Sequence, residues 1–173
     1  MTGAMAAPTH TVLHAAEADL DRVARCWLAM AAHHASIADA AWIRRTAEDS
    51  WRRRRASYAA WLASGEGRLL LAVPAGEPAA AADGYAFVRV RKGGETFDLG
   101  ERVGELESLA VVAEARGVGV GGLLLDAARE LLRREGIAHW FVSYIEGNDG
   151  ADRLYRRAGF RPFARTLMGP VEP

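Results

Sequence analysis

The sequence predicts a mixed α/β fold in which helices cover both faces of a β-sheet. The first observation is the order of hydrophobic periodicities along the chain, which reads strand, two helices, three strands, helix, strand, helix and strand. The second is the composition of the 173 residues, of which 50% are hydrophobic and 25% are charged, as in soluble globular proteins. A core of this size buries about 70% of the surface of the unfolded chain. We therefore expect a flexible N-terminal tail over residues 1–10 and a single domain over residues 11–173.

The first part of the predicted domain contains a short strand and two helices. Residues 11–14 form the strand. From Asp19 onward, apolar residues recur at steps of three and four and so make one apolar helix face, with Leu20, Val23, Ala24, Trp27, Met30 and Ala31. Thr46 then opens a Thr-x-x-Asp capping pattern that predicts the start of the second helix. Gly65 suits the end of that helix.

Three strands are predicted next, over residues 68–73, 84–91 and 103–112. Pro74 stops the first of them, because proline cannot donate a backbone hydrogen bond to a sheet. The second shows the alternation of side chains that is typical of a strand. Between the second and the third, the segment around Phe97 predicts a polar hairpin or loop.

The C-terminal third of the chain alternates helix and strand. Its predicted elements are helix 119–135, strand 139–145, helix 149–158 and a last strand 160–168. A glycine follows each of the two helices, as is common at helix C-termini. The sequence shows no internal repeat and no clear linker.

Charge and cysteine content exclude several classes of function. The chain has 22 basic and 22 acidic residues, so it lacks the positive field expected of a nucleic-acid-binding protein. Cys26 is the only cysteine, which excludes an intramolecular disulfide and a cysteine-rich zinc site. His33 and His34 lack a further ligand at helical spacing, so we expect a helix-end pair rather than a metal site. No signal peptide and no membrane span are recognisable, and a reducing cytoplasm is the expected location.

A glycine-rich turn between a strand and a helix carries the main functional signal. The strand ends near Val112, and the glycines at 117, 119, 121 and 122 lead directly into the helix. Glycines let the backbone approach a ligand closely, and the free amides at a helix start attract phosphate. A P-loop would need Gly-Lys-Ser/Thr where this chain has Gly121-Gly122-Leu123, and the spacing does not match a dinucleotide fingerprint either. A tight packing turn is the alternative interpretation.

The pattern Arg116-x-x-Gly119-x-Gly121, preceded by Leu109-Ala-Val111, resembles the acetyl-CoA motif of the GNAT superfamily of N-acetyltransferases. Asn148 and the stretch Leu154–Phe160 resemble the second cofactor element of the same superfamily. The resemblance is specific from Glu105 to Phe163 and rests before residue 100 on the order of elements alone.

The resemblance implies a mostly antiparallel, splayed sheet of six to seven strands and acetyl-CoA as acyl donor, without a metal. The strand near Val111 would splay at a bulge and pair with the pantetheine arm, and the amide of Val111 would face the thioester carbonyl. The implied cofactor-binding residues are Leu109, Ala110, Val111, Arg116, Gly117, Val118, Gly119, Val120, Gly121, Gly122, Asn148 and Tyr155.

Direct acyl transfer to an amine needs a base for the amine and an acid for the leaving thiolate. Tyr155 matches the general acid of the superfamily, with plain packing against the cofactor as the alternative. Asn148 is expected to bond the pantetheine or only to cap its helix. Glu105 and Glu107 lie two apart on a strand and so share a face, where either is the candidate base. A solvated strand face is the alternative interpretation of this pair.

The acceptor is expected to be the primary amine of a small molecule. The alternative is a protein or peptide acceptor, acetylated at its N-terminus or on a lysine. Ribosomal-protein N-terminal acetyltransferases carry a glutamate where this chain has Ser143, which argues against their substrate class. An acyl-CoA-binding sensor without turnover is the alternative of another class. Asp98 and Glu101 are candidate partners for a cationic acceptor. Tryptophans of the two-helix region are candidate pocket residues, namely Trp27, Trp42, Trp51 and Trp61.

One remaining feature is expected to be structural. The basic run Arg52–Arg55 could touch RNA or a cofactor phosphate, but a solvated helix face fits its aromatic surroundings better. A homodimer is possible by analogy with related folds, in which the last strand takes part in pairing.

Overall fold

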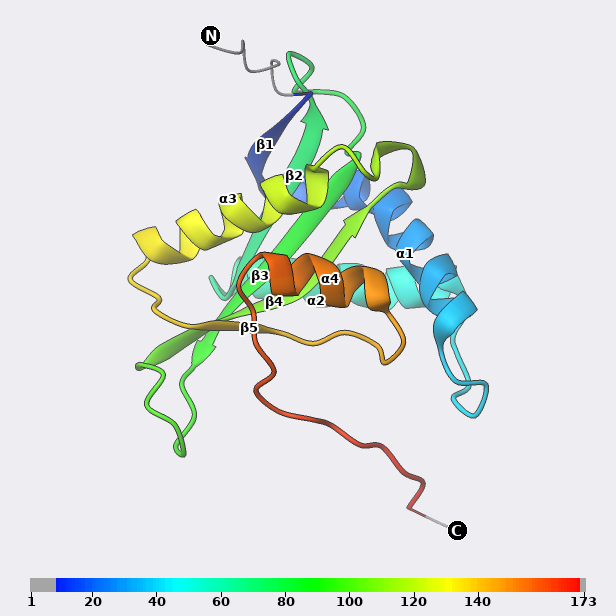
Figure 1. The fold of residues 1–173 in the computed structure, drawn as a ribbon. Coiled ribbons are helices and arrows are strands. Elements are labelled where there is room, and N and C mark those ends of the chain that lie inside the picture. The colour runs from blue at the N-terminus through cyan, green and yellow to red at the C-terminus, as the bar shows by residue number, and fades with distance from the viewer. Residues whose placement is uncertain (1–8, 172–173) are drawn as a thin grey trace, which may run out of the picture.

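The computed structural model describes residues 9–171, and in this range it contains one five-stranded sheet (Figure 1). The strands lie side by side in chain order, and all neighbours are antiparallel except β4 and β5, which are parallel. The predicted mostly antiparallel sheet is therefore confirmed. The strands are β1 (His10–Ala15), β2 (Gly67–Pro74), β3 (Gly84–Lys92), β4 (Arg102–Val111) and β5 (Trp140–Val142).

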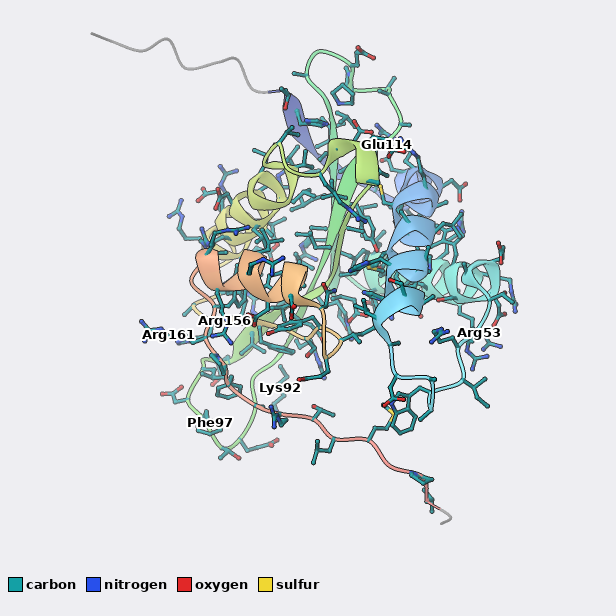
Figure 2. The ribbon with its side chains drawn as sticks, turned by 45° about the vertical axis from the view of Figure 1, so that its right-hand side comes forward. Arg53, Lys92, Phe97, Glu114, Arg156 and Arg161 are labelled. Carbon is teal, nitrogen blue, oxygen red and sulfur yellow. The ribbon has the colours of Figure 1, made fainter. Side chains whose placement is uncertain are left out.

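Helices cover both faces of this sheet, as predicted. Figure 2 views the sheet close to edge-on, with α3 and α4 on one side and α1 and α2 on the other. The α-helices are α1 (Ala24–Ile37), α2 (Ala47–Ala63), α3 (Val120–Arg134) and α4 (Asp149–Arg157). Two short 3₁₀ helices, η1 (Glu17–Val23) and η2 (Ala113–Ala115), precede α1 and α3.

The core forms because β3 is buried on both faces. Phe87 stacks on Tyr58 of α2, with ring centroids 3.9 Å apart. On the opposite face, a Cβ at Gly84 would come within 3.1 Å of Val120 and Leu124 of α3. The central strand thus holds the two helical layers at fixed positions relative to each other.

Local capping signals locate the helix ends well. The side chain of Thr46 accepts a hydrogen bond from the amide of Asp49 at 3.2 Å, so the predicted cap of α2 is confirmed. Gly65 and Gly136 adopt positive φ after α2 and α3, a conformation that glycine takes without strain. The predicted helix from Asp19 begins instead as the 3₁₀ turn η1 and becomes α-helical at Ala24.

The predicted last strand over residues 160–168 is wrong, because residues 160–170 form no helix or strand. Pro162 cannot donate to a sheet, and the following side chains are exposed, so the segment lacks a buried face to hold it in a sheet. Phe163 instead packs edge-on against Phe97 of the β3–β4 loop, with ring centroids 5.1 Å apart. In the described range the sheet therefore has five strands rather than six to seven.

Two of the predicted strands have other bounds in the structure. Residues 1–8 of the expected tail lie outside the described residues, and β1 already begins at His10. The strand predicted over 139–145 is present but shorter, because β5 pairs with β4 over only three residues.

Candidate active site

The strands β4 and β5 separate part-way along their length. Their parallel pairing covers Gly104–Leu106 on β4 and ends at Val142 on β5. At the same point the register between β3 and β4 shifts, since Phe87 pairs with Ser108 and Val88 with Leu106. Glu107 is therefore the extra residue of a β-bulge, which re-aims the end of the strand. The splayed strand that the resemblance implied is thus present, with its bulge at Glu107.

A cavity of about 620 Å³ lies beyond this separation. It is lined by the end of β4, the glycine-rich turn, the first turn of α3, one face of α4 and the C-terminal half of α1. Every residue predicted to bind the cofactor is part of this lining except Val118, whose side chain is 60% exposed. Residues that are distant in sequence are therefore brought to one site.

The glycine-rich turn keeps one wall of the cavity open. Gly117 and Gly119 have φ values of 81° and 93°, which residues with a Cβ rarely adopt. A Cβ at Gly119 or Gly122 would meet no atom within 4 Å, so both positions border free space. The first amides of α3 lack partners within the helix and carry the positive end of its dipole. This wall suits a negatively charged group.

Arginines line the cavity, and no carboxylate of the described residues does. Arg116 donates its Nε–H to the carbonyl of Val111 at 3.0 Å and thereby braces the turn against β4. Arg153 and Arg157 stand four residues apart on α4 and so share one helix face. The sequence analysis missed these two, although their spacing around Tyr155 is a usable signal.

Tyr155 and Asn148 come from α4 and its cap. Tyr155 is 7% exposed, and burial, together with the nearby Tyr144, raises its pKa to about 12. Among residues 9–171 its hydroxyl has no hydrogen-bond partner. Asn148 caps α4 by accepting the amide of Ala151 at 3.2 Å. The expected capping role of Asn148 is therefore confirmed, whereas its role toward a cofactor stays a prediction.

Glu105 and Glu107 lie outside the cavity lining and are paired with arginines. Glu105 is 3.1 Å from Arg91 and 3.6 Å from Arg89, both on β3. Glu107 forms an ion pair with Arg54 of α2. The structure thus places both carboxylates next to fixed positive charges rather than in the cavity.

The tryptophans mostly belong to an aromatic cluster between the sheet and α2. Trp27 and Trp61 flank Tyr58, and the guanidinium of Arg54 lies 5.3 to 5.8 Å from the three ring centroids. Trp51 packs on Trp27, while Trp42 is 43% exposed. None of these four tryptophans lines the cavity.

The arginines of the basic run of α2 all form ion pairs within the protein. Arg52 and Arg53 pair with Asp49 of the same helix, and Arg55 pairs with Asp21. Each arginine of the run, Arg54 included, therefore has a carboxylate partner within the protein. This agrees with the structural interpretation of the run.

The C-terminal half of α1 contributes three lining residues that the sequence analysis did not assign to a site, namely Met30, His33 and His34. The imidazole of His33 is 3.5 Å from the side-chain oxygen of Asn148. Helical spacing could have indicated these three residues, because Met30, His33 and His34 continue the apolar stripe of α1.

The model of the acetyltransferase (GNAT) family matches residues 23–160, which is most of the chain. The chain belongs to this family. As a GNAT protein it is an acetyl-CoA-dependent N-acetyltransferase, and the resemblance seen in the glycine-rich turn is confirmed.

Solved structures agree with this fold. The GNAT chain is similar to a GCN5-related N-acetyltransferase from Ralstonia eutropha, with 21% identity, coverage of 95% and 99% of the two chains and a TM-score of 0.72. It is also similar to an aminoglycoside 6′-N-acetyltransferase from Acinetobacter haemolyticus, with 17% identity, coverage of 94% and 99% and a TM-score of 0.65.

A ribosomal-protein-alanine N-acetyltransferase from Brucella melitensis has the same fold, with 12% identity, coverage of 93% and 98% and a TM-score of 0.63. A comparison with curated protein sequences gives no match. Within residues 9–171, no helix is long and apolar enough to cross a membrane. The same part of the chain holds no cluster of three or more side chains suited to a metal ion.

Proposed function

We propose that this GNAT protein transfers the acetyl group of acetyl-CoA to the primary amine of a small molecule, with the donor in the cavity between β4, α3 and α4. The observation that supports this most is the combination of free helix amides and cationic side chains around one cavity without a carboxylate. Such a set fits the phosphates of CoA.

The α3 wall would hold the pyrophosphate. Gly119 and Gly122 leave the space that a Cβ would fill, so phosphate oxygens can approach the amides of the first turn of α3. Arg153 and Arg157 extend this positive surface along α4 and are candidates for the remaining phosphate. Val118, with its exposed side chain, would contribute only its backbone.

The free edge of β4 would hold the pantetheine arm. Beyond Leu106, β4 has no partner on its β5 side among residues 9–171, so the backbone from Leu109 to Val111 can pair with an extended chain, as an added strand would. The amide of Val111 would then be the candidate donor to the thioester oxygen.

Tyr155 is the proposed acid. A tyrosine hydroxyl is protonated at neutral pH even at its ordinary pKa, and burial raises the pKa of Tyr155 to about 12, so the proton is present when the thiolate leaves. In the reaction the amine nitrogen forms a bond to the acetyl carbon and the carbon–sulfur bond breaks. One proton passes from Tyr155 to the leaving sulfur. The nitrogen of the attacking ammonium loses two protons in all, the first to a base before the attack and the second after the bond to carbon has formed. One of these two protons is released to solvent in net terms, and the other replaces the proton that Tyr155 gave up. The earlier candidates for that base, Glu105 and Glu107, remain predictions and are paired with arginines.

We propose further that the acceptor carries a single amine. Recognition of a polycation such as an aminoglycoside needs several carboxylates, and the described lining contains none. Asp98 and Glu101 lie on the β3–β4 loop and are not part of the lining either. Ser143 replaces the glutamate expected of a ribosomal-protein acetyltransferase, which argues against a peptide N-terminus.

The test is release of CoA from acetyl-CoA, followed with a thiol dye over a divided panel. One half holds amino acids, arylalkylamines, polyamines and aminoglycosides, and the other holds peptides with varied N-termini and internal lysines. Burial raises the pKa of Cys26 to about 12, so the protein itself adds little dye signal. Release with monoamines is expected, whereas release with peptides alone would refute the proposed acceptor class.

A further inference from the structure

Two histidines line the cavity because α1 has a continuous inner face. Cys26 and Trp27 are buried on this face. Met30, His33 and His34 follow at helical spacing, and all three line the cavity. Since β4 and β5 have separated at this level, the inner face of α1 meets the cavity there instead of more sheet.

The cap of α4 defines which nitrogen of His33 carries the proton. The Oδ1 atom of Asn148 accepts the amide of Ala151, which identifies this atom as the oxygen rather than the nitrogen of the side-chain amide. That oxygen lies 3.5 Å from Nε2 of His33 and can only accept, so Nε2 donates. In the neutral ring the lone pair then resides on Nδ1.

We propose that Nδ1 of His33 is the base that removes a proton from the ammonium of the acceptor, with Asn148 as its positioning residue. This inference rests on the proposed function. The acceptor loses one N–H proton to Nδ1 and becomes a neutral amine, and His33 becomes an imidazolium that later releases the proton to solvent. The neutral amine then attacks the acetyl carbon.

The other titratable groups around the cavity do not fill this role. Arg116, Arg153 and Arg157 carry guanidinium groups that only donate hydrogen bonds, and Tyr155 supplies a proton rather than accepting one. His34 has its pKa lowered by burial and by the adjacent His33, but no hydrogen bond of the described residues orients its ring. No carboxylate of the described residues lines the cavity. Nδ1 of His33 is thus the one basic nitrogen of the described lining side chains whose orientation is fixed by a hydrogen bond of its ring.

The test compares His33→Gln with His14→Gln. Glutamine at position 33 can still donate a hydrogen bond to Asn148 but has no basic nitrogen. His14 is exposed on β1, outside the cavity, and serves as the matched control. We expect His33→Gln to lower kcat/KM for the best amine by roughly 100-fold or more, as for loss of a general base, with an unchanged Kd for acetyl-CoA. The acidic limb of its pH profile should flatten, and added imidazole should restore part of the rate.

A second variant tests the positioning by Asn148. Asn148→Asp keeps an acceptor oxygen and a good helix cap but adds a negative charge next to His33. The acidic limb of the kcat/KM profile should therefore move to higher pH, because the imidazolium is stabilised. An acidic limb that stays in place would show that the titrating group is not next to Asn148, which would contradict His33 as the base.

The possible outcomes separate the two proposals. An active wild-type protein whose His33→Gln variant keeps both its rate and its acidic limb overturns the base and leaves the acetyl transfer standing. If the wild-type protein releases no CoA with any of the amines tested, the transfer itself is refuted, and the role of His33 with it. A fall in rate with an unchanged acidic limb also contradicts the base and makes His33 structural.

Discussion

The strand β4 has a closed part and an open part. At Glu105 and Glu107 the side chains are covered by arginines of β3 and α2, whereas from Leu109 to Val111 the strand borders a cavity. Both parts belong to one strand and one sequence motif. The difference arises from what the neighbouring elements supply, namely charged and aromatic side chains from α2 and glycines from the start of α3. A polar residue near a site is therefore available for chemistry only if no neighbour has already neutralised it.

Closing the open part tests most directly whether it borders the site of the donor. Gly122 is helical and a Cβ there meets nothing within 4 Å, so Gly122→Trp should fill the cavity without straining α3. We expect acetyl-CoA to bind roughly 100-fold more weakly, a loss of about 2.7 kcal/mol, measured by calorimetry. Gly122→Ala is the control, because it favours the helix by up to about 1 kcal/mol and leaves most of the space. If both variants bind acetyl-CoA with equal affinity, the donor does not bind in this cavity.

Tyr155 tests whether the open part also supplies the acid. Tyr155→Phe removes only the hydroxyl and keeps the ring that packs against Phe160. We expect kcat to fall about 10- to 100-fold while the Kd for acetyl-CoA stays within about twofold. Stopped-flow kinetics and calorimetry separate the two quantities. A loss of affinity without a loss of kcat would make the tyrosine a packing residue.

Alkaline unfolding compares the buried hydroxyls of the two parts. The pKa values of Tyr58 and Tyr155 are both raised to about 12, mainly by burial. In the unfolded chain a tyrosine ionises near 10, so each stabilising contribution is complete below about pH 10 and is lost as the pH rises toward 12. The free energy of unfolding should fall by about 2–3 kcal/mol per tyrosine over this range, measured by urea titrations. Tyr155→Phe should show a shallower fall; an identical fall would contradict the assignment.

Glu107 tests whether the closed part of β4 serves stability rather than catalysis. Its carboxylate is 14% exposed and pairs with Arg54, so Glu107→Gln should lower the free energy of unfolding by about 1 kcal/mol. Its effect on kcat/KM decides between Glu107 and His33 as the base. A change of less than about threefold is expected if His33 is the base, and a fall of roughly 100-fold would restore Glu107 to that role and refute His33.

The smallest expected effect concerns Cys26. Its thiol is buried and donates to the carbonyl of Ala82 at 3.3 Å, and burial raises its pKa to about 12. A thiol dye at pH 8 should therefore leave the folded protein almost unlabelled and react fully in denaturant. Rapid labelling without denaturant would show that α1 opens readily from the sheet.

The sequence by itself determined the order of helices and strands, the cap at Thr46, the glycine-rich turn and the family. These features depend on residues that are close together in the chain, where periodicity, capping and glycine geometry act directly. Only the tertiary structure decided that residues 160–168 do not join the sheet, because pairing depends on the neighbouring edge and not on the segment alone. It also brought Arg54 to Glu107, 53 residues away, and His33 to Asn148, 115 residues away. Such contacts follow from how the layers pack, and they set the charge, the tautomer and the accessibility of each side chain at the site.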